Sequence, residues 1–473
     1  MPTSRRPPVV ALVAVAALLV LVTTTGGAPS GSVAVSLSAG DSTPRVPTGL
    51  DPVIGDQTRP NVVLIMADDM RYDDLQYMPN VQRLIGDEGV EFENAFSPHP
   101  LCCPARASFL SGQYTHNHRV WSNADPFGFR AFRDAQTLPV WLDEVGYNTG
   151  FVGKYLNRYG GQELRNGQSS LYYVPPGWTD WRGSVDSAHE AGSDYGGSTY
   201  HYFDTTLNVD GELERHRGRY QTRLFGTESE DLIERFASSP NPFFLWSSYV
   251  APHDGWPVEP DDPGEVRRDD GRITNFKTAA RPRDVKDSFD DVIAAAPGGE
   301  GEEDVSGKPF FIRNLPPLNE EEKTALLEAT RQRAEALSVL DAEVEQTIDA
   351  LERTGELDDT VVVFTSDNGY FLGEHRQRLG KMLPYEPSLR VPVLMRGPEL
   401  PEGEVREDPF LIIDFAPTLL ELAGAQPQPS IDGVSLLDVA RNGDRGWTRG
   451  VFTETGPRQV SDISESENFQ VPG

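Results

Sequence analysis

Both cysteines of this 473-residue chain are neighbours, Cys102 and Cys103, in the segment Cys-Cys-Pro-Ala-Arg. Only Cys102 has a proline two positions later, Pro104, and an arginine four positions later, Arg106. A disulfide between sequence neighbours is strained, so the even number of cysteines does not predict a bridge. The ordinary interpretation is two small buried thiols. The alternative is that Cys102 does chemistry near a helix start at Arg106, where N–H groups and a guanidinium would hold an oxyanion.

Hard oxygen ligands follow two apolar runs, at residues 61–67 and 360–366. Carboxylate and amide oxygens suit Ca²⁺ or Mg²⁺, whereas zinc favours histidine or thiolate. An Asp-Asp pair alone is more often a solvated turn, and Asn-Gly is a common turn signal. Because each group directly follows a buried strand, we predict a metal site. Its expected ligands are Asp68, Asp69, Asp367 and Asn368.

Three further residues could bind a tetrahedral anion or move a proton. Lys154 ends a short apolar run and Lys381 lies beyond the run at 360–366, although lone lysines are usually solvated. His253 follows a third apolar run, and its imidazole could protonate a leaving alcohol near neutral pH. A structural histidine at a strand end is the alternative. The histidines expected to line the same cleft are His116, His118 and His375.

The elements that must position these residues follow an α/β pattern. The runs 61–67, 242–250 and 360–366 indicate strands covered on both faces. Each delivers polar groups at its carboxyl end, where open α/β sheets place their ligands. Apolar residues at spacings of three and four predict a helix from the N-cap Asn319 to Gly355. This helix leads into the next strand, which indicates a mostly parallel sheet.

Composition limits the partners. The net charge of −31 argues against nucleic acid as a partner, because no broad basic surface is available to neutralise phosphates. The same charge repels an anionic substrate, so a few placed cations must bind it locally. A length of 473 residues allows one large domain and a smaller piece.

The amino-terminal residues have the pattern of an export signal. Arg5 and Arg6 precede an apolar run from Val9 to Val22. A retained membrane anchor is the alternative, although the run is short for a span. We therefore expect a secreted or cell-surface protein that meets a membrane only if this segment is retained. The expected divisions are a signal or anchor at 1–28, a linker at 29–59, a catalytic domain at 60–425 with an acidic insertion at 257–307 (a lid or a disordered loop), and a short remnant at 426–473.

In this order and spacing, the chain resembles the sulfatase family of the alkaline-phosphatase superfamily from Pro60 to about Gly424. The resemblance is carried by VVLIMADDM, CCPARASFLSGQYTHNH, GFVGKYLNRYG, APH, FTSDNGYFLGEH and RVPVLMRGP. The tracts LCCPARASFLSGQYTHNHRV and VGKYLNRYG are most similar to the N-acetylglucosamine-6-sulfatase branch, which acts on sulfated amino sugars of glycosaminoglycans.

The resemblance implies an alkaline-phosphatase-like sandwich, with a mostly parallel sheet flanked by helices and a C-terminal antiparallel subdomain that is cut short. It implies that a formylglycine-generating enzyme oxidises Cys102 to formylglycine, which also touches a Ca²⁺ or Mg²⁺ ion. The implied metal ligands are the four residues named above. The implied anion-binding residues are Arg106, Lys154, His253 and Lys381.

The implied reaction is hydrolysis of a sulfate ester on a sulfated carbohydrate. One hydroxyl of the hydrated aldehyde attacks sulfur and displaces the sugar alcohol, and the second then expels sulfate. The metal and the cations neutralise the transferring group. Leu156 stands where many sulfatases have a histidine, which makes His116 a candidate to hold the second hydroxyl, and Ala105 replaces the commoner serine.

Two other functions fit the same residues. One is a phosphomonoester or phosphonate hydrolase of the same superfamily, because the fold alone does not separate sulfate from phosphate. The segment Gly373-Glu374-His375 is compatible with it. The other is a non-catalytic relative that binds sulfated glycans.

Overall fold

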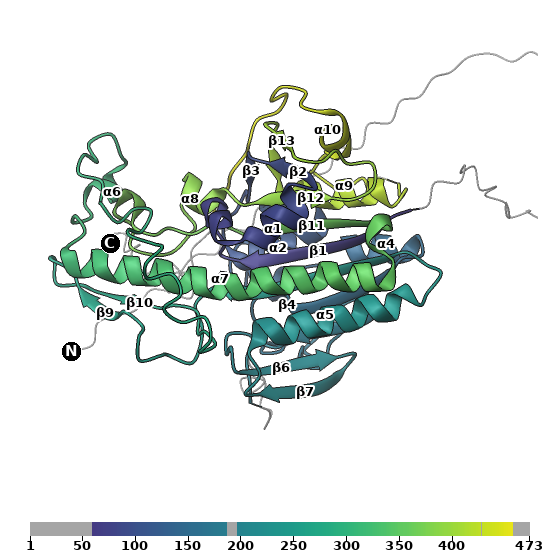
Figure 1. Cartoon of the computed structure of the whole chain (residues 1–473), viewed down its shortest axis with the longest axis horizontal. Helices are drawn as coiled ribbons and strands as arrows, with labels where there is room; N and C mark the ends of the chain where they lie inside the picture. Colours follow the sequence, from purple (N-terminus) through teal and green to yellow (C-terminus); the bar gives the residue numbers. More distant parts are fainter. Residues whose placement is uncertain (1–58, 187–195, 427, 457–473) are drawn as a thin grey trace, which may run out of the picture. The chain divides into compact units, whose positions relative to one another are not determined.

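One ten-stranded sheet organises the chain, in a computed structural model that describes residues 59–186, 196–426 and 428–456. The predicted signal segment 1–28 and nearly all of the linker lie outside the described residues. The strand order is β13-β2-β12-β11-β1-β8-β4-β5-β6-β7 (Figure 1). In that order the strands are Glu404–Arg406, Gly89–Phe92, Val393–Arg396, Thr360–Ser366, Asn61–Asp68, Phe243–Pro252, Asn148–Lys154, Asp180–Ser184, Asp204–Val209 and Glu212–Arg217.

The centre of this sheet is parallel. Strands β11, β1, β8, β4 and β5 pair parallel with their neighbours, whereas β12 and β6 add antiparallel strands on the two sides. The predicted mostly parallel α/β sheet is therefore confirmed. The three predicted strands correspond to β1, β8 and β11, with bounds that differ by at most two residues.

Strand β1 shows why the sheet is covered on both faces. All eight of its residues are buried. Successive side chains of a strand point to opposite faces of the sheet. Val62, Leu64 and Met66 therefore join one hydrophobic cluster. Val63, Ile65 and Ala67 join a second cluster on the other face. Because both faces of this strand are covered, its sequence is a continuous apolar run.

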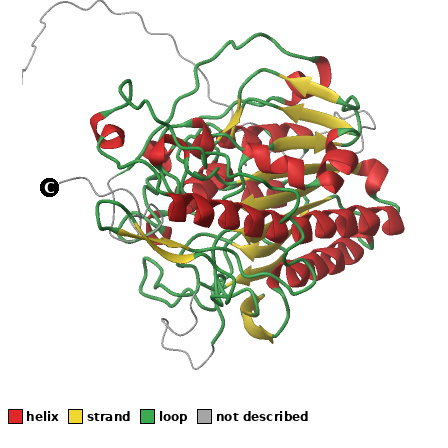
Figure 2. Ribbon diagram, turned by 60° about the vertical axis from the view of Figure 1, so that its left-hand side comes forward, coloured by secondary structure: helices red, strands yellow, loops and turns green. Residues whose placement is uncertain are grey.

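Helices form a layer on each face. Helices α5 (Gln221–Ala237) and α7 (Glu320–Thr354) lie side by side across one face, and Figure 2 shows strands behind the long helix. The other face packs against α2 (Cys102–Ser111), α4 (Leu138–Glu144) and α9 (Phe415–Leu422). The short helices are α1 (Pro79–Val81), α3 (Thr115–His118), α6 (Phe310–Arg313), α8 (Glu386–Leu389) and α10 (Leu437–Asn442).

The ends of α7 follow from its sequence. The Asn319 side chain accepts a hydrogen bond from the N–H of Glu322, and the Glu322 carboxylate accepts one from the N–H of Asn319, both at 2.9 Å. This capping box satisfies two N–H groups that otherwise lack partners. At the other end Gly355 adopts a φ of 78°, which glycine adopts without strain. The helix predicted between Asn319 and Gly355 is thus confirmed.

The acidic segment 257–307 contains regular structure that its weak periodicity did not predict. Strands β9 (Gly264–Arg267) and β10 (Ile273–Phe276) pair as an antiparallel ladder, and their buried Val266 and Phe276 pack with Leu326 of α7. Four-residue strands are too short to give a clear period, which explains the difference. The segment therefore packs onto α7.

Residues 428–456 dock on the same domain. Helix α10 packs beside α9 in the core, and Arg449 pairs with the buried Asp414. A small ladder joins β3 (Ala95–Phe96) to β14 (Phe410–Leu411). A shortened C-terminal antiparallel subdomain stays a prediction. Among the helices that the structure describes, none has both the length and the apolar composition to cross a membrane.

Candidate active site

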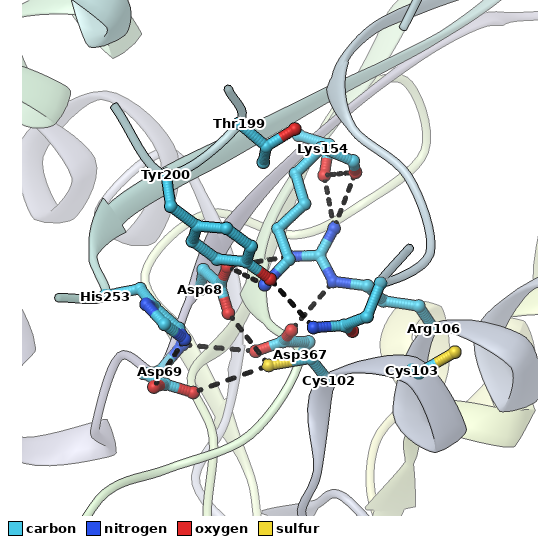
Figure 3. A network of polar contacts seen from close by, with 12 residues as sticks. Asp68, Asp69, Cys102, Cys103, Arg106, Lys154, Thr199, Tyr200, His253 and Asp367 are labelled. Atoms are coloured by element: carbon cyan, nitrogen blue, oxygen red, sulfur yellow. Dashed lines mark hydrogen bonds and ion pairs between the residues drawn. The ribbon is translucent and has the colours of Figure 1, made fainter. Parts of the chain in front are cut away.

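Four parallel strands bring the predicted site residues to one edge of the sheet. Ala67 of β1 pairs with Ser366 of β11, so the polar residues that directly follow these two strands become neighbours. Strand β8 ends at Pro252 opposite Asp68, and β4 ends at Lys154. The nine residues brought together, all buried, are Asp68, Asp69, Cys102, Arg106, Lys154, His253, Asp367, Asn368 and Lys381. Figure 3 shows the first seven of them.

Cys102 is the first residue of α2, so this helix begins four residues before the position expected from the sequence. Its Sγ atom lies 3.4 Å from Oδ1 of Asp68 and 2.8 Å from Nζ of Lys381. The free N–H groups of a helix start favour negative charge, so an oxygen in place of Sγ would be stabilised here. The neighbouring Cys103 is also buried, and its backbone N–H donates to Asn123 at 3.0 Å.

Arg106, one turn further along α2, ties the strand ends together. Its Nε donates to Oδ2 of Asp367 at 2.8 Å, and its Nη1 donates to the Lys154 carbonyl at 2.7 Å. Its Nη2 lies 3.7 Å from Oδ2 of Asp68 and, within the described residues, has no hydrogen-bond partner. A buried donor without a partner is costly, so Nη2 is a ready contact for an oxygen of a bound anion.

Two lysines occupy the acidic side of the site. Lys154 Nζ donates to Oδ2 of Asp68, and Lys381 Nζ lies 2.5 Å from Oδ1 of Asp69. Glycine is required just before Lys154, because a Cβ on Gly153 would lie 2.0 Å from the Ser248 carbonyl oxygen. The lysines therefore sit where they could contact the oxygens of a tetrahedral anion.

The contacts of His253 define its tautomer. Its Nδ1 lies 2.7 Å from the Asp254 carbonyl, which can only accept, so Nδ1 carries a hydrogen. The other nitrogen, Nε2, lies 3.7 Å from Oδ2 of Asp69 and faces the site. A ring oriented in this way can hold or release a proton at Nε2.

The donor atoms fit a hard divalent cation. Ligand atoms of Asp68, Asp69, Cys102 and His253 lie within 4.8 Å of one another. The buried Oδ1 of Asn368 has no hydrogen-bond partner in the described chain, while its Nδ2 donates to Asp69 at 2.6 Å. An amide oxygen that lacks a donor beside several carboxylates matches the ligand set of Ca²⁺ or Mg²⁺. Asp69 also adopts a φ of 64°, a strained value that functional sites often contain.

The charges around the site set its ionisation. Burial opposes ionisation of Asp68, but Lys154, His253 and Arg106 outweigh it and lower the pKa of Asp68 to about 2. Burial likewise opposes ionisation of Asp69, yet Lys381 and His253 lower its pKa. Burial and the charge of Asp68 raise the pKa of the Cys102 thiol well above its ordinary value. Since the thiolate is the reactive form, an unmodified Cys102 is a poor nucleophile at neutral pH.

The remaining predicted histidines lie elsewhere. His116 has a side chain 47% exposed and pairs with Glu454 at 2.9 Å, so the expectation that it holds a hydroxyl at the buried Cys102 is wrong. His118 is buried, and its Nε2 lies 3.0 Å from Oγ of Ser108. His375 pairs with Glu302 at 2.8 Å. Each of the three rings has its own partners away from the nine site residues.

Three residues of the site were missed in the sequence. Ser248 accepts from Nη1 of Arg106 and donates to the Lys154 carbonyl, both at 2.6 Å; the signal was a polar residue inside an apolar strand. Arg333 donates to the Asp69 carbonyl at 2.6 Å, and its signal was a charge on the buried face of α7. Tyr200 lies in a loop, where nothing in the sequence singled it out. Its ring centre lies 4.9 Å from Nζ of Lys154 and 5.1 Å from the His253 ring (Figure 3).

Comparison with known proteins assigns the chain to a family. Residues 60–425 match the Sulfatase family model, so the chain belongs to the sulfatase family, which is a family of enzymes. An extracellular sulfatase SULF-1 homolog of Drosophila melanogaster is 30% identical over 427 residues, which cover 87% of this chain and 34% of the relative. The N-acetylglucosamine-6-sulfatase of Homo sapiens is 31% identical over 411 residues, covering 84% of this chain and 67% of the relative.

A solved structure shares the fold at lower identity. It is a protein in complex with its substrate D-glucosamine-2-N,6-O-disulfate, with a TM-score of 0.60 and 23% identity, and the match covers 83% of each chain. The present chain thus spans about a third of the Drosophila relative and about two thirds of the human one.

Proposed function

We propose that this protein is a sulfuric ester hydrolase that removes sulfate from sulfated sugars of the glucosamine-6-sulfate type. The observation that carries the proposal is the position of Cys102, at the start of α2 and in contact with both Asp68 and Lys381. The high pKa of the thiol argues against cysteine itself as the nucleophile. Oxidation of Cys102 to formylglycine by a formylglycine-generating enzyme resolves this conflict.

The buried cations would bind the sulfate group. Arg106 offers Nη2, which has no hydrogen-bond partner among the described residues, and Lys154 and Lys381 offer ammonium groups beside Asp68 and Cys102. Donors that are already fixed need no reorganisation as charge develops on the transferring group. His253, with a hydrogen on Nδ1 and Nε2 facing the site, would give a proton to the sugar oxygen as it leaves.

A divalent cation and a formylglycine hydrate would complete the site. Asp68, Asp69, Asp367 and Asn368 would hold Ca²⁺ or Mg²⁺, which acts as a Lewis acid toward a sulfate oxygen. The formylglycine hydrate would supply one hydroxyl to attack sulfur and a second through which sulfate is released. Around them, Lys381 and the α2 N–H groups stabilise negative charge on an oxygen at position 102.

The substrate class and the location rest on relatives. The match to an N-acetylglucosamine-6-sulfatase supports a sulfated amino sugar as substrate. The name of the extracellular Drosophila relative and the apolar run near the amino terminus support secretion or display at the cell surface.

The test uses protein from a host that makes formylglycine. Mass spectrometry of the tryptic peptide Leu84–Arg106 should show an aldehyde at Cys102 and an intact thiol at Cys103. The same protein should release sulfate from glucosamine-6-sulfate much faster than phosphate from the matching phosphate ester, and Cys102→Ala should abolish release while Cys103→Ser retains it. Faster phosphate release would favour a phosphohydrolase. Glycan binding without turnover of either ester would favour a non-catalytic relative.

A further inference from the structure

A large basic cavity lies apart from the Cys102 site. Its volume is about 850 Å³, and its lining comes from the end of α2, from α3, from residues 125–136 and from Arg165. Ser111, the last residue of α2, lines it, whereas Cys102 is the first residue of the same helix. At a rise of 1.5 Å per residue the two ends of this helix are about 14 Å apart. None of the nine site residues lines the cavity.

The lining has an excess of positive charge. Of its four arginines, Arg130 pairs with Asp125 at 3.1 Å. Arg119, Arg133 and Arg165 have no acidic partner among the residues that the structure describes. The chain has 73 acidic and 42 basic residues, so acidic partners are abundant elsewhere on it. Three guanidinium groups without an acidic partner in the described part of the chain thus line one cavity, and they create a local positive potential on a protein whose net charge is strongly negative.

A second cavity adjoins the first and shares part of its wall. The adjoining cavity has a volume of about 240 Å³ and shares Arg130, Phe132 and Arg165 with the first. Phe127 contributes to the wall of the first cavity and Phe129 to that of the second. Guanidinium forks bind sulfate and carboxylate groups through paired hydrogen bonds, and aromatic rings provide flat apolar contact area. The two linings combine four arginines with phenylalanine rings and two carboxylates, Asp125 and Asp134, and this excess of guanidinium groups beside apolar walls suits sugar rings that carry anionic groups.

We propose that the two cavities form an accessory binding groove for a sulfated polysaccharide, separate from the site at Cys102. The inference rests on the proposed function, because the occupant is the polymer whose sulfate esters would be hydrolysed. The net charge of −31 repels such a polymer, and the groove supplies a local attraction at the other end of α2 from Cys102. Binding here would keep the polymer near the site between successive hydrolytic events.

The test measures binding without turnover. Heparin is the probe, and it is titrated by calorimetry into the Cys102→Ala protein, so the outcome does not depend on ester hydrolysis. In this background the triple variant Arg119→Ala, Arg133→Ala, Arg165→Ala should weaken binding about tenfold or more, because three charge-assisted contacts are lost. The matched control removes the same charge at three exposed arginines outside the groove, in the triple variant Arg219→Ala, Arg283→Ala, Arg313→Ala. It should change the heparin Kd less than twofold.

Three results would overturn the groove. One is equal heparin binding by the two triple variants when both unfold at the parent temperature. Another is equal loss of heparin and single-stranded DNA binding in the groove variant, which would indicate a general polyanion surface. The third is unchanged binding of desulfated heparin, which would remove sulfate from the recognition. If the groove variant loses heparin binding while the unmutated protein releases no sulfate, that result would support the binding groove and contradict the proposed hydrolase activity.

Discussion

The Nζ atom of Lys381 lies 2.8 Å from Sγ of Cys102, although the two residues are 279 positions apart in the sequence. The same ammonium group lies 2.5 Å from Oδ1 of Asp69. All three side chains are buried, so little water screens the positive charge. Lys381 therefore links the position of the proposed nucleophile to the carboxylates of the proposed metal site.

Replacing Lys381 should lower the rate of sulfate ester hydrolysis. We expect Lys381→Met to lower kcat/KM for a sulfate ester about 10²–10³-fold, because one fixed donor to the developing charge is lost. Steady-state kinetics on protein with verified formylglycine content would measure the loss. Lys323→Met, on the surface of α7 where Lys323 pairs with Glu320, is the control and should keep normal kinetics. Equal activity of both variants would exclude Lys381 from the reaction.

Asn368 should contribute to binding of a divalent cation. Its buried Oδ1 lacks a hydrogen-bond donor in the described chain, and Asn368→Ala removes this oxygen. Calcium at 100 times its Kd should stabilise the unmutated protein by about 2.7 kcal/mol. At the same calcium concentration, Asn368→Ala should be stabilised clearly less. Chelation of the ion should stop turnover reversibly. Thermal unfolding with and without calcium measures the stabilisation of each protein, and the exposed Asn166→Ala is the control variant. An equal calcium shift in both variants would place the ion elsewhere.

The sequence predicted the residues at the strand ends because chemistry and local structure coincide there. Asp68, Asp367 and His253 each follow an apolar run long enough to be recognised as a buried strand, and parallel strands end at a common edge. The capped helix α7 was predictable for a similar reason, since its caps and its period agree.

Residues whose roles depend on tertiary contacts could not be predicted in this way. Tyr200 lies in a loop without periodicity, and only the fold brings its ring to Lys154. His116 lies in a motif close to Cys102 in sequence, yet α2 separates them and turns His116 toward Glu454. The strands of the 257–307 segment are too short for their pattern to exceed the background of an acidic, glycine-rich sequence.

Arg106 should be essential for stability as well as for catalysis. Its guanidinium is fully buried and contacts Asp367, the Lys154 carbonyl and Ser248. Arg106→Ala leaves Asp367 buried with a lost partner, so we expect a destabilisation of about 3–5 kcal/mol. Arg83→Ala, which breaks an exposed pair with Glu345, should cost less than about 1 kcal/mol. Denaturant unfolding compares the two variants, and similar midpoints would contradict a structural role for the Arg106 network.

Glu343 gives stability a dependence on pH that is separate from the site. It is 9% exposed on α7, and burial together with the charge of Glu230 raises its pKa from 4.5 to about 7. The folded chain therefore binds more protons at this group than the unfolded chain between pH 4.5 and 7, so its contribution to stability falls as the pH rises through that range. We expect Glu343→Gln to flatten this slope and to raise the unfolding free energy at pH 8 by about 1–3 kcal/mol.

Denaturant unfolding from pH 4.5 to 8 measures the dependence of the unfolding free energy on pH. Glu352→Gln, exposed on the same helix, should leave it unchanged. A slope equal to that of the unmutated protein in Glu343→Gln would show that this carboxyl group ionises normally in the fold.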